Sequence, residues 1–247
     1  YRYAGESNSV NNYICLGSDA TTCPEDNLFR IIGVFGDQIK VIKVKSIGNL
    51  AWDENNSNTW STSSLNTYLN GTYLTSLGTL AEKIATTTWK VGGNTYAKIR
   101  DTVPATAYQN EVVNPVTTNT TDNATEYSAK IGLIYVSDYY YSANPDAWNF
   151  AGVLNDIDSS TKDYRNAKSW MKNLKGYDMW TITRNSDETT NAYAANTSRF
   201  QNNRFIYGQL FNYAVNKVNP VFPVFSLLNS VTYSSGSGTS SDPIRIN

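Results

Sequence analysis

The residues best suited to ligand chemistry lie within residues 131–150, which read IGLIYVSDYYYSANPDAWNF. An apolar run leads into a cluster of tyrosines, and an Asn-Pro-Asp triplet and a Trp-Asn pair follow closely. Carboxylate and amide oxygens are the ligands that Ca²⁺ prefers, roughly six to eight of them at about 2.3–2.6 Å. Amphipathic aromatic rings suit contacts with sugars and with proteins. The segment therefore predicts either a ligand-binding loop with a cation or a strand end followed by a turn.

The candidate ligand-binding side chains of this segment are aromatic or carry oxygen: Tyr139, Tyr141, Asn144, Asp146, Trp148 and Asn149. If the segment continues as a strand, alternation places Tyr139 and Tyr141 on one side and Tyr140 on the other, so that part of the cluster belongs to the core. The triplet holds a single carboxylate, and a calcium site would have to combine Asp138 with Asp146. We favour a metal-free turn and expect no cofactor, with bound calcium as the alternative.

Catalysis is not indicated by the reactive residues. The sequence has no histidine, which excludes Ser-His and Cys-His catalysis and histidine-ligated zinc. Adjacent acids at Asp53–Glu54 and Asp187–Glu188 could serve a glycoside hydrolase only if two acids faced each other across a cleft. Adjacent acids in polar surroundings are more typical of loops and helix caps. We expect a noncatalytic protein and keep a carboxylate-dependent hydrolase as a third hypothesis.

Composition and charge narrow the class of partner. The 247 residues have a net charge of −1, with 40% apolar and 17% charged residues. There is no block of Lys and Arg to follow a phosphate backbone, so we expect no nucleic-acid partner. No run approaches the roughly 20 apolar residues that span a bilayer. The neutral surface rich in Asn, Ser, Thr and Tyr is commoner outside cells, and the start YRYAGESNSV suggests a processed or excised chain.

The two cysteines, Cys15 and Cys23, lie in YICLGSDATTCPEDN, with turn-forming residues between them. In an exported protein this spacing predicts a disulfide that closes a short loop. The alternative is a pair of free thiols in a cytosolic protein.

The clearest secondary structure is a hairpin over residues 28–44, with a tight turn at Gly36-Asp37. Alternation in the second strand predicts that Lys40, Lys43 and Lys45 face water. The pattern slips by one residue near Val41–Ile42, which indicates a bulge or a strand buried on both faces.

Two further segments, residues 63–89 and 159–176, have helical apolar spacing, and glycines at 71 and 78 divide the first. Residues 93–127 predict a long loop insertion. Further strands are expected at 129–136, 177–184 and 204–215. Strands and helices without regular alternation predict an α+β fold with an antiparallel sheet, formed by one domain over residues 1–247.

Several blocks occur in a fixed order: LFRIIGVFGDQIKVIK, SIGNLAWD, WSTSSLNTYLNG, KIGLIYVSDYYYS, MWTITR and VTYSSGSGTSSDPIRI. In this order they resemble exported proteins of gut-type Gram-positive bacteria with C-type-lectin-like domains, some of which follow a type IV pilin-like segment. The resemblance covers residues 13–246 and implies adjacent first and last strands, two flanking helices and long loops on one face. In NPVFPVFSLL, Asn219 replaces the usual Arg and Pro223 interrupts the strand, which predicts an edge strand or a bulge.

The resemblance implies no chemistry, and it leads to two main hypotheses. The first is an extracellular cell-surface module that recognises a glycan or a protein in adhesion. The second is a structural subunit that assembles with copies of itself into a pilus-like filament.

Overall fold

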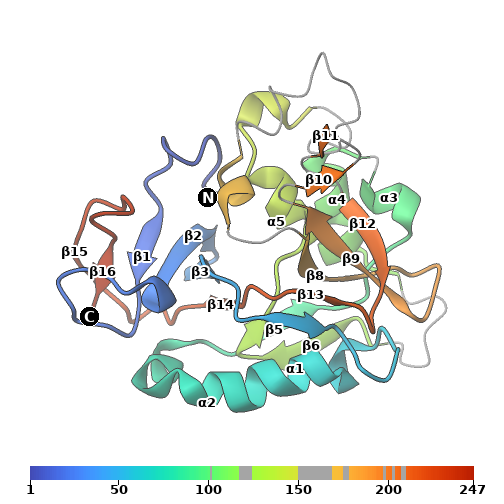
Figure 1. Ribbon diagram of the computed structural model, residues 1–247, viewed down its shortest axis with the longest axis horizontal. Coiled ribbons are helices and arrows are strands. Elements are labelled where there is room, and N and C mark those ends of the chain that lie inside the picture. Colours follow the sequence, from blue (N-terminus) through green and yellow to red (C-terminus); the bar gives the residue numbers. More distant parts are fainter. Residues whose placement is uncertain are drawn as a thin grey trace.

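Strands and short helices follow one another along the chain without regular alternation (Figure 1). The computed structural model describes residues 1–100, 102–116, 124–149, 169–174, 178–196, 199–201, 204–206 and 210–247. The fold is mixed α+β with mostly antiparallel sheets, as the sequence predicts. No helix within these ranges is both long enough and apolar enough to cross a membrane.

The largest sheet has five strands in the order β1-β2-β3-β14-β7, and every neighbouring pair is antiparallel. Its strands are β1 (Tyr13–Cys15), β2 (Leu28–Phe35), β3 (Gln38–Lys43), β14 (Val224–Ser226) and β7 (Ile131–Gly132). A second antiparallel sheet has three strands, β12 (Leu210–Ala214), β9 (Asn191–Asn196) and β8 (Asp178–Arg184).

Four two-stranded ladders complete the described strands. They are β4 (Asn49–Ala51) with β13 (Val218–Pro220), β5 (Thr87–Lys90) with β6 (Glu126–Ala129), β10 (Arg199–Gln201) with β11 (Arg204–Ile206), and β15 (Tyr233–Ser235) with β16 (Arg245–Ile246).

The helices are short. They are α1 (Ser64–Tyr68), α2 (Leu74–Ser76), α3 (Tyr96–Arg100), α4 (Pro104–Tyr108) and α5 (Val136–Tyr141), with π turns at Leu69–Tyr73 and Gln109–Val113. Short 3-10 turns lie at Glu25–Asn27, Trp60–Thr62, Gly78–Lys83, Pro145–Ala147 and Trp170–Asn173.

The first predicted helical segment is correct in position. A Ser63 cap, whose side chain accepts from the Asn66 amide, starts α1, and the helical path continues through the π turn into α2 along the lower edge of Figure 1. Gly71 lies within this path and does not break it, whereas Gly78 adopts φ +56° just after it ends. The second predicted helix lies outside the described residues, apart from Ser169–Leu174, where a 3-10 turn buries Trp170.

The segment over residues 93–127 differs from the predicted loop insertion. It contains α3, α4 and the π turn that ends at Val113, and residues 117–123 lie outside the described chain. The Pro104 ring suits the first turn of α4 because that position needs no backbone donor.

The hairpin of β2 and β3 forms as predicted, and Gly36 in its turn adopts φ +62°. The predicted irregularity is present, but the extra residue is Ile32 of β2, between the pairs Ile31–Val41 and Gly33–Lys40. Residues 40–43 are buried on both faces of the sheet.

The prediction that Lys40, Lys43 and Lys45 face water is wrong for Lys40 and Lys43. Lys40 is 7% exposed and Lys43 is 6% exposed. Period-two alternation separates the two faces of a strand but does not show that either face is exposed to solvent. Here a lysine on each face has polar partners.

Two other strand predictions need correction. The expected strand over 129–136 ends at Gly132, and α5 begins at Val136. The strand after Pro223 is not an edge, because β14 pairs with β3 on one side and with β7 on the other. Pro223 precedes its first residue, where a missing backbone donor is tolerated.

The first and last strands lie next to each other, as predicted. The Cys15 amide donates to the Ile244 carbonyl and the Ile244 amide to the Tyr13 carbonyl, both at 2.9 Å. The resulting bridge is parallel. A specific C-type-lectin-like fold is a finer assignment than this topology supports.

Candidate ligand-binding site

The tyrosine cluster is helical and mostly internal. The alternation expected for a strand is therefore wrong: Tyr139 and Tyr140 are both buried, at 1% and 0% exposed. The Tyr140 hydroxyl donates to the Arg100 carbonyl at 3.1 Å. Tyr141 is half-buried and packs edge-on against Trp148 with ring centroids 5.0 Å apart, while the Arg2 guanidinium lies 4.6 Å from its ring centroid.

The Asn-Pro-Asp triplet forms a capped 3-10 turn. Asn144 Oδ1 accepts from the Asp146 amide at 3.1 Å, and Trp148 Nε1 donates to the Ala143 carbonyl at 3.0 Å. Asp146 and Asn149 are exposed beside this turn. The structure thus places the predicted residues on one short segment, but most of their polar groups serve the local fold.

The other predicted calcium ligand, Asp138, is engaged by two cations. Its Oδ1 lies 2.6 Å from Arg2 Nη1, and its Oδ2 lies 2.5 Å from Lys40 Nζ and 3.1 Å from the Tyr135 amide. Burial alone would raise the pKa of Asp138, but Lys40 and then Arg2 outweigh burial and hold it below its ordinary value. Across the ranges the structure describes, no group of three or more acidic or cysteine side chains could hold a metal ion.

A second buried acid, Glu111, caps the same helix. Its Oε1 accepts from the Ser137 amide at 2.6 Å, and its Oε2 accepts from the Val136 amide at 3.1 Å and from Thr183 Oγ1 at 2.5 Å. Burial raises the pKa of Glu111 to about 7, against hydrogen bonds that lower it. The two carboxylates together satisfy the first amides of α5.

The acids named as possible catalytic pairs also have structural roles. Asp53 is 2% exposed, and its carboxylate accepts from the Ser57 amide at 2.9 Å and from the Ser64 amide at 3.0 Å. Glu188 accepts from Asn212 Nδ2 at 3.4 Å, and Asp187 accepts from the Tyr96 amide at 3.4 Å. These contacts match the loop and capping interpretation.

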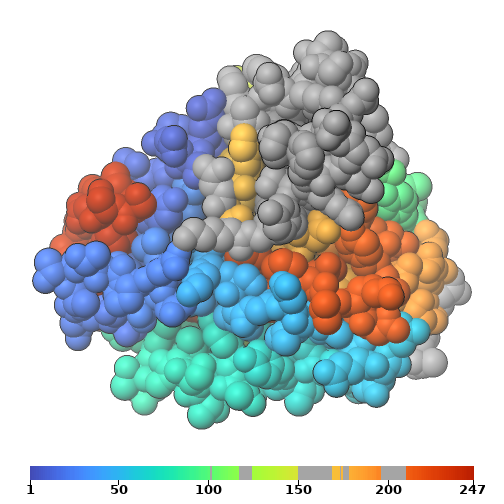
Figure 2. Space-filling view, in the orientation of Figure 1, coloured from blue at the N-terminus to red at the C-terminus, as the bar shows by residue number. Residues whose placement is uncertain are grey.

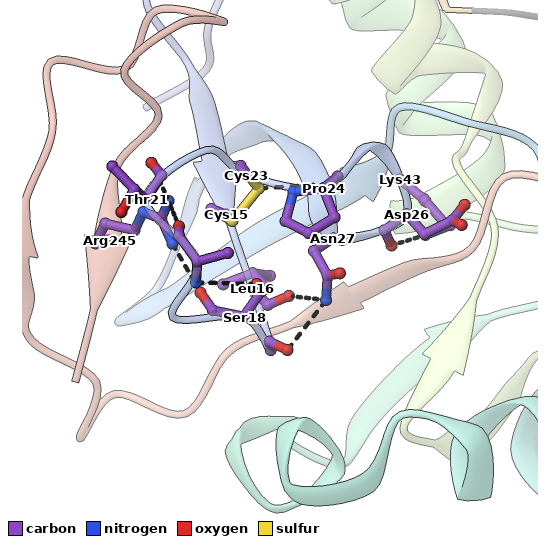
Figure 3. Close-up of a disulfide and its surroundings, with 12 residues drawn as sticks. Cys15, Leu16, Ser18, Thr21, Cys23, Pro24, Asp26, Asn27, Lys43 and Arg245 are labelled. Atoms are coloured by element: carbon purple, nitrogen blue, oxygen red, sulfur yellow. Dashed lines mark hydrogen bonds between the residues drawn. A yellow bond between two sulfur atoms is a disulfide. The ribbon is translucent and has the colours of Figure 1, made fainter.

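The disulfide between Cys15 and Cys23 is present, as predicted, and it closes a loop that side chains hold on two sides (Figure 3). Asn27 Nδ2 donates to the Leu16 carbonyl at 2.8 Å and to the Gly17 carbonyl at 3.1 Å. From the C-terminal strand, Arg245 donates to the carbonyls of Ser18 and Ala20, both at 2.7 Å. These hydrogen bonds hold the loop in one position, so that it can form the wall of a groove.

Two grooves flank this wall. One has a volume of about 660 Å³ and separates the loop from the hairpin of β15 and β16, with walls of mostly small hydroxyl and charged side chains. The other has a volume of about 540 Å³ and separates the loop and β3 from the helical segment through α2. Figure 2 shows that helical segment along the lower edge, beneath the N-terminal part of the chain. Both volumes suit a small ligand or a short segment of a larger one.

The second groove, which we call the Tyr73 groove, combines an apolar floor with polar groups. Its lining residues are Leu16, Gly17, Asp26, Asn27, Phe29, Lys43, Lys45, Ser46, Ile47, Tyr73, Ser76, Leu77 and Leu80. The Tyr73 hydroxyl is buried without a hydrogen-bond partner among the described residues. The Lys43 ammonium donates to the Asp26 carbonyl.

None of the Tyr73 groove was predicted as a site. In the sequence Tyr73 belongs to the apolar stripe of a helix and Lys43 to the polar side of a strand, so each has an ordinary role. The groove forms only because the disulfide loop, β3 and α2 come together in the folded chain, and no local sequence pattern indicates that they do.

The chain matches no protein-family model, and comparison with curated proteins and with solved structures yields no match either. The resemblance to C-type-lectin-like surface proteins therefore stays a prediction.

Proposed function

We propose that this protein is a noncatalytic module of the extracellular cell surface that recognises a glycan or protein ligand through the Tyr73 groove. The observation that carries the proposal is a preformed groove whose wall includes a buried, unpartnered hydroxyl. Buried polar groups are nearly always hydrogen-bonded in folded proteins, and exceptions point to a missing partner. A ligand oxygen or amide would supply that partner.

The engagement of the acids supports a role in binding. Asp138 is neutralised by Arg2 and Lys40, and Glu111 accepts three hydrogen bonds from the protein. A general acid or base must reach the proton of a substrate, and both carboxylates are about 1% exposed. The extracellular location rests on the disulfide, which persists in oxidising compartments, and on the resemblance.

A groove-filling variant tests this proposal. Ser76→Trp places an indole at the exposed rim of the Tyr73 groove, and Thr72→Trp places one on the same helical segment outside the groove. Oxidised wild type should bind members of a panel of surface glycans and purified surface proteins. Binding should fall about 10-fold or more in Ser76→Trp, by exclusion from the groove, and stay unchanged in Thr72→Trp. A blank panel for wild type, or equal binding by both variants, would refute the proposal.

A further inference from the structure

The two lysines in the wall of the Tyr73 groove have different partners. Lys43 and Lys45 line the groove with one acid, Asp26, and a second acid, Glu25, lies beside its rim. Lys45 Nζ lies 3.2 Å from Asp26 Oδ1 and 3.7 Å from Glu25 Oε2 at the exposed rim. Both carboxylates are therefore paired with Lys45, and Lys43 depends on other acceptors.

Lys43 is the buried lysine of the groove. Its ammonium donates to the backbone carbonyl of Asp26 (Figure 3). The same ammonium lies 5.1 Å from the centroid of the Phe29 ring. No carboxylate lies within ion-pair distance of it in the described part of the chain. An ammonium has three donors, and a buried charge is costly unless it is paired and hydrogen-bonded. Lys43 thus has donors left for an anionic acceptor.

Tyr73 contributes a second donor to the same groove. The residue is 7% exposed, and its hydroxyl has no partner in the described residues. Burial is the main cause that raises the pKa of Tyr73, with smaller contributions from Tyr68 and Asp26. The phenol therefore remains protonated and can donate to a ligand oxygen.

The remaining walls are mainly aliphatic. They are formed by Leu16, Ile47, Leu77 and Leu80, together with Phe29. Leu77 and Ile47 are half-buried, so a ligand that covers them would remove apolar surface from water. These walls suit an alkyl or branched aliphatic body.

We propose that the Tyr73 groove binds an amphipathic monocarboxylate, whose carboxylate accepts from Lys43 Nζ and the Tyr73 hydroxyl and whose aliphatic body covers the leucine walls. A carboxylate supplies both a negative charge in direct contact with Lys43 and acceptor lone pairs, and hydrogen bonds between charged groups are roughly twice as strong as neutral ones. This inference rests on the proposed function, because it names the chemical class recognised by the same groove. A fatty acyl chain and the C-terminus of a peptide with an aliphatic last residue share this chemistry.

Calorimetric titration with small probes tests the ligand class. Octanoate represents the acyl source and N-acetyl-leucine the peptide source, while octanamide keeps the body of octanoate without its charge. At least one of the two carboxylates should bind. If octanoate binds more tightly than N-acetyl-leucine, octanamide should bind about 10-fold more weakly than octanoate. The stronger of the two carboxylates identifies the source.

Matched variants test the two donors. Lys43→Met removes the buried charge and should lower the affinity for the bound carboxylate about 10-fold or more. The affinity for octanamide should not change. Tyr73→Phe removes only the unpartnered hydroxyl and should lower the affinity for the carboxylate about 5-fold. The control Lys217→Met removes the charge of an exposed lysine outside the groove and should have an effect below about 2-fold. Near-ultraviolet circular dichroism checks that each variant is folded, and Tyr73→Phe carries the test if Lys43→Met is not.

The proposal is overturned if neither carboxylate binds at millimolar concentration, or if binding does not depend on Lys43 and Tyr73. These failures leave the recognition role standing when Ser76→Trp still abolishes binding to the surface panel. Carboxylate binding together with a blank surface panel has the opposite meaning: the ligand class is then correct and the adhesion role is refuted.

Discussion

Replacing Glu111 by Gln should remove a pH dependence from the stability of the protein. The Glu111 carboxylate is 1% exposed and accepts hydrogen bonds from the Val136 and Ser137 amides and from Thr183. These bonds favour the ionised form, but burial opposes it more strongly and raises the pKa from 4.5 to about 7. The folded protein therefore holds this proton at pH values where the unfolded chain has released it.

The sign of the effect follows from proton linkage. Below pH 4.5 Glu111 is protonated in both states, and above about pH 7 it is ionised in both. Between these values the native state binds more protons than the unfolded state, so stability falls as pH rises. At about 1.36 kcal/mol per pKa unit, the full gap is worth about 3 kcal/mol, of which about 2.5 kcal/mol falls between pH 5 and pH 8.

Urea unfolding followed by tryptophan fluorescence measures this quantity. Wild type should lose about 2.5 kcal/mol between pH 5 and pH 8 relative to Glu111→Gln, because other groups titrate alike in both proteins. The variant should be less stable than wild type at pH 5, because its amide group presents N–H donors to a backbone donor. The exposed acid Glu54 provides a matched control, and Glu54→Gln should keep the wild-type dependence. A relative loss below about 0.5 kcal/mol would refute the reasoning.

Three further substitutions test the structure by urea unfolding. Asp138→Asn should lower the free energy of unfolding by about 3–5 kcal/mol at neutral pH, because it leaves two buried cations without a carboxylate. The cations hold the pKa of Asp138 down, so wild type should lose this extra stability on acidification below about pH 4. Replacing Cys15 and Cys23 by Ser should cost about 2.5 kcal/mol from loop entropy, and an unchanged midpoint after reduction of wild type would contradict this estimate. Gly33→Ala should cost about 1–3 kcal/mol, because its Cβ would lie 2.2 Å from a backbone carbonyl oxygen. Gly71→Ala, which meets nothing within 4 Å, should be neutral or stabilising and serves as its control.

Local patterns were sufficient where the structure depends on neighbouring residues. The β-branched run, the Gly36-Asp37 turn and the slip in the alternation predicted the β2–β3 hairpin and its bulge. The turn-forming residues between Cys15 and Cys23 predicted their disulfide. In each case the partners are close in sequence, so propensity and spacing carry the information.

The wrong predictions come from contacts between residues that are far apart in the sequence. Lys40 was expected to face water, but it pairs with Asp138, which lies 98 residues further along the chain. The start of α5 was missed because its amides are capped by Glu111, 25 and 26 residues away, and a six-residue helix has little intrinsic stability of its own. A single sequence does not reveal which acid meets which amide or ammonium.

Buried charged groups have different partners in two parts of the molecule, and this contrast supports the proposed site. Around α5, Asp138 receives three hydrogen bonds and so does Glu111, so both buried carboxylates are matched by donors. In the Tyr73 groove the same chain leaves a hydroxyl unpartnered and holds the Lys43 ammonium on one backbone carbonyl. Where donors of this kind line a groove, a ligand can complete their hydrogen bonds. The unmatched donors at Tyr73 and Lys43, on a wall fixed by the disulfide loop, are therefore the physical reason to look for an acceptor there.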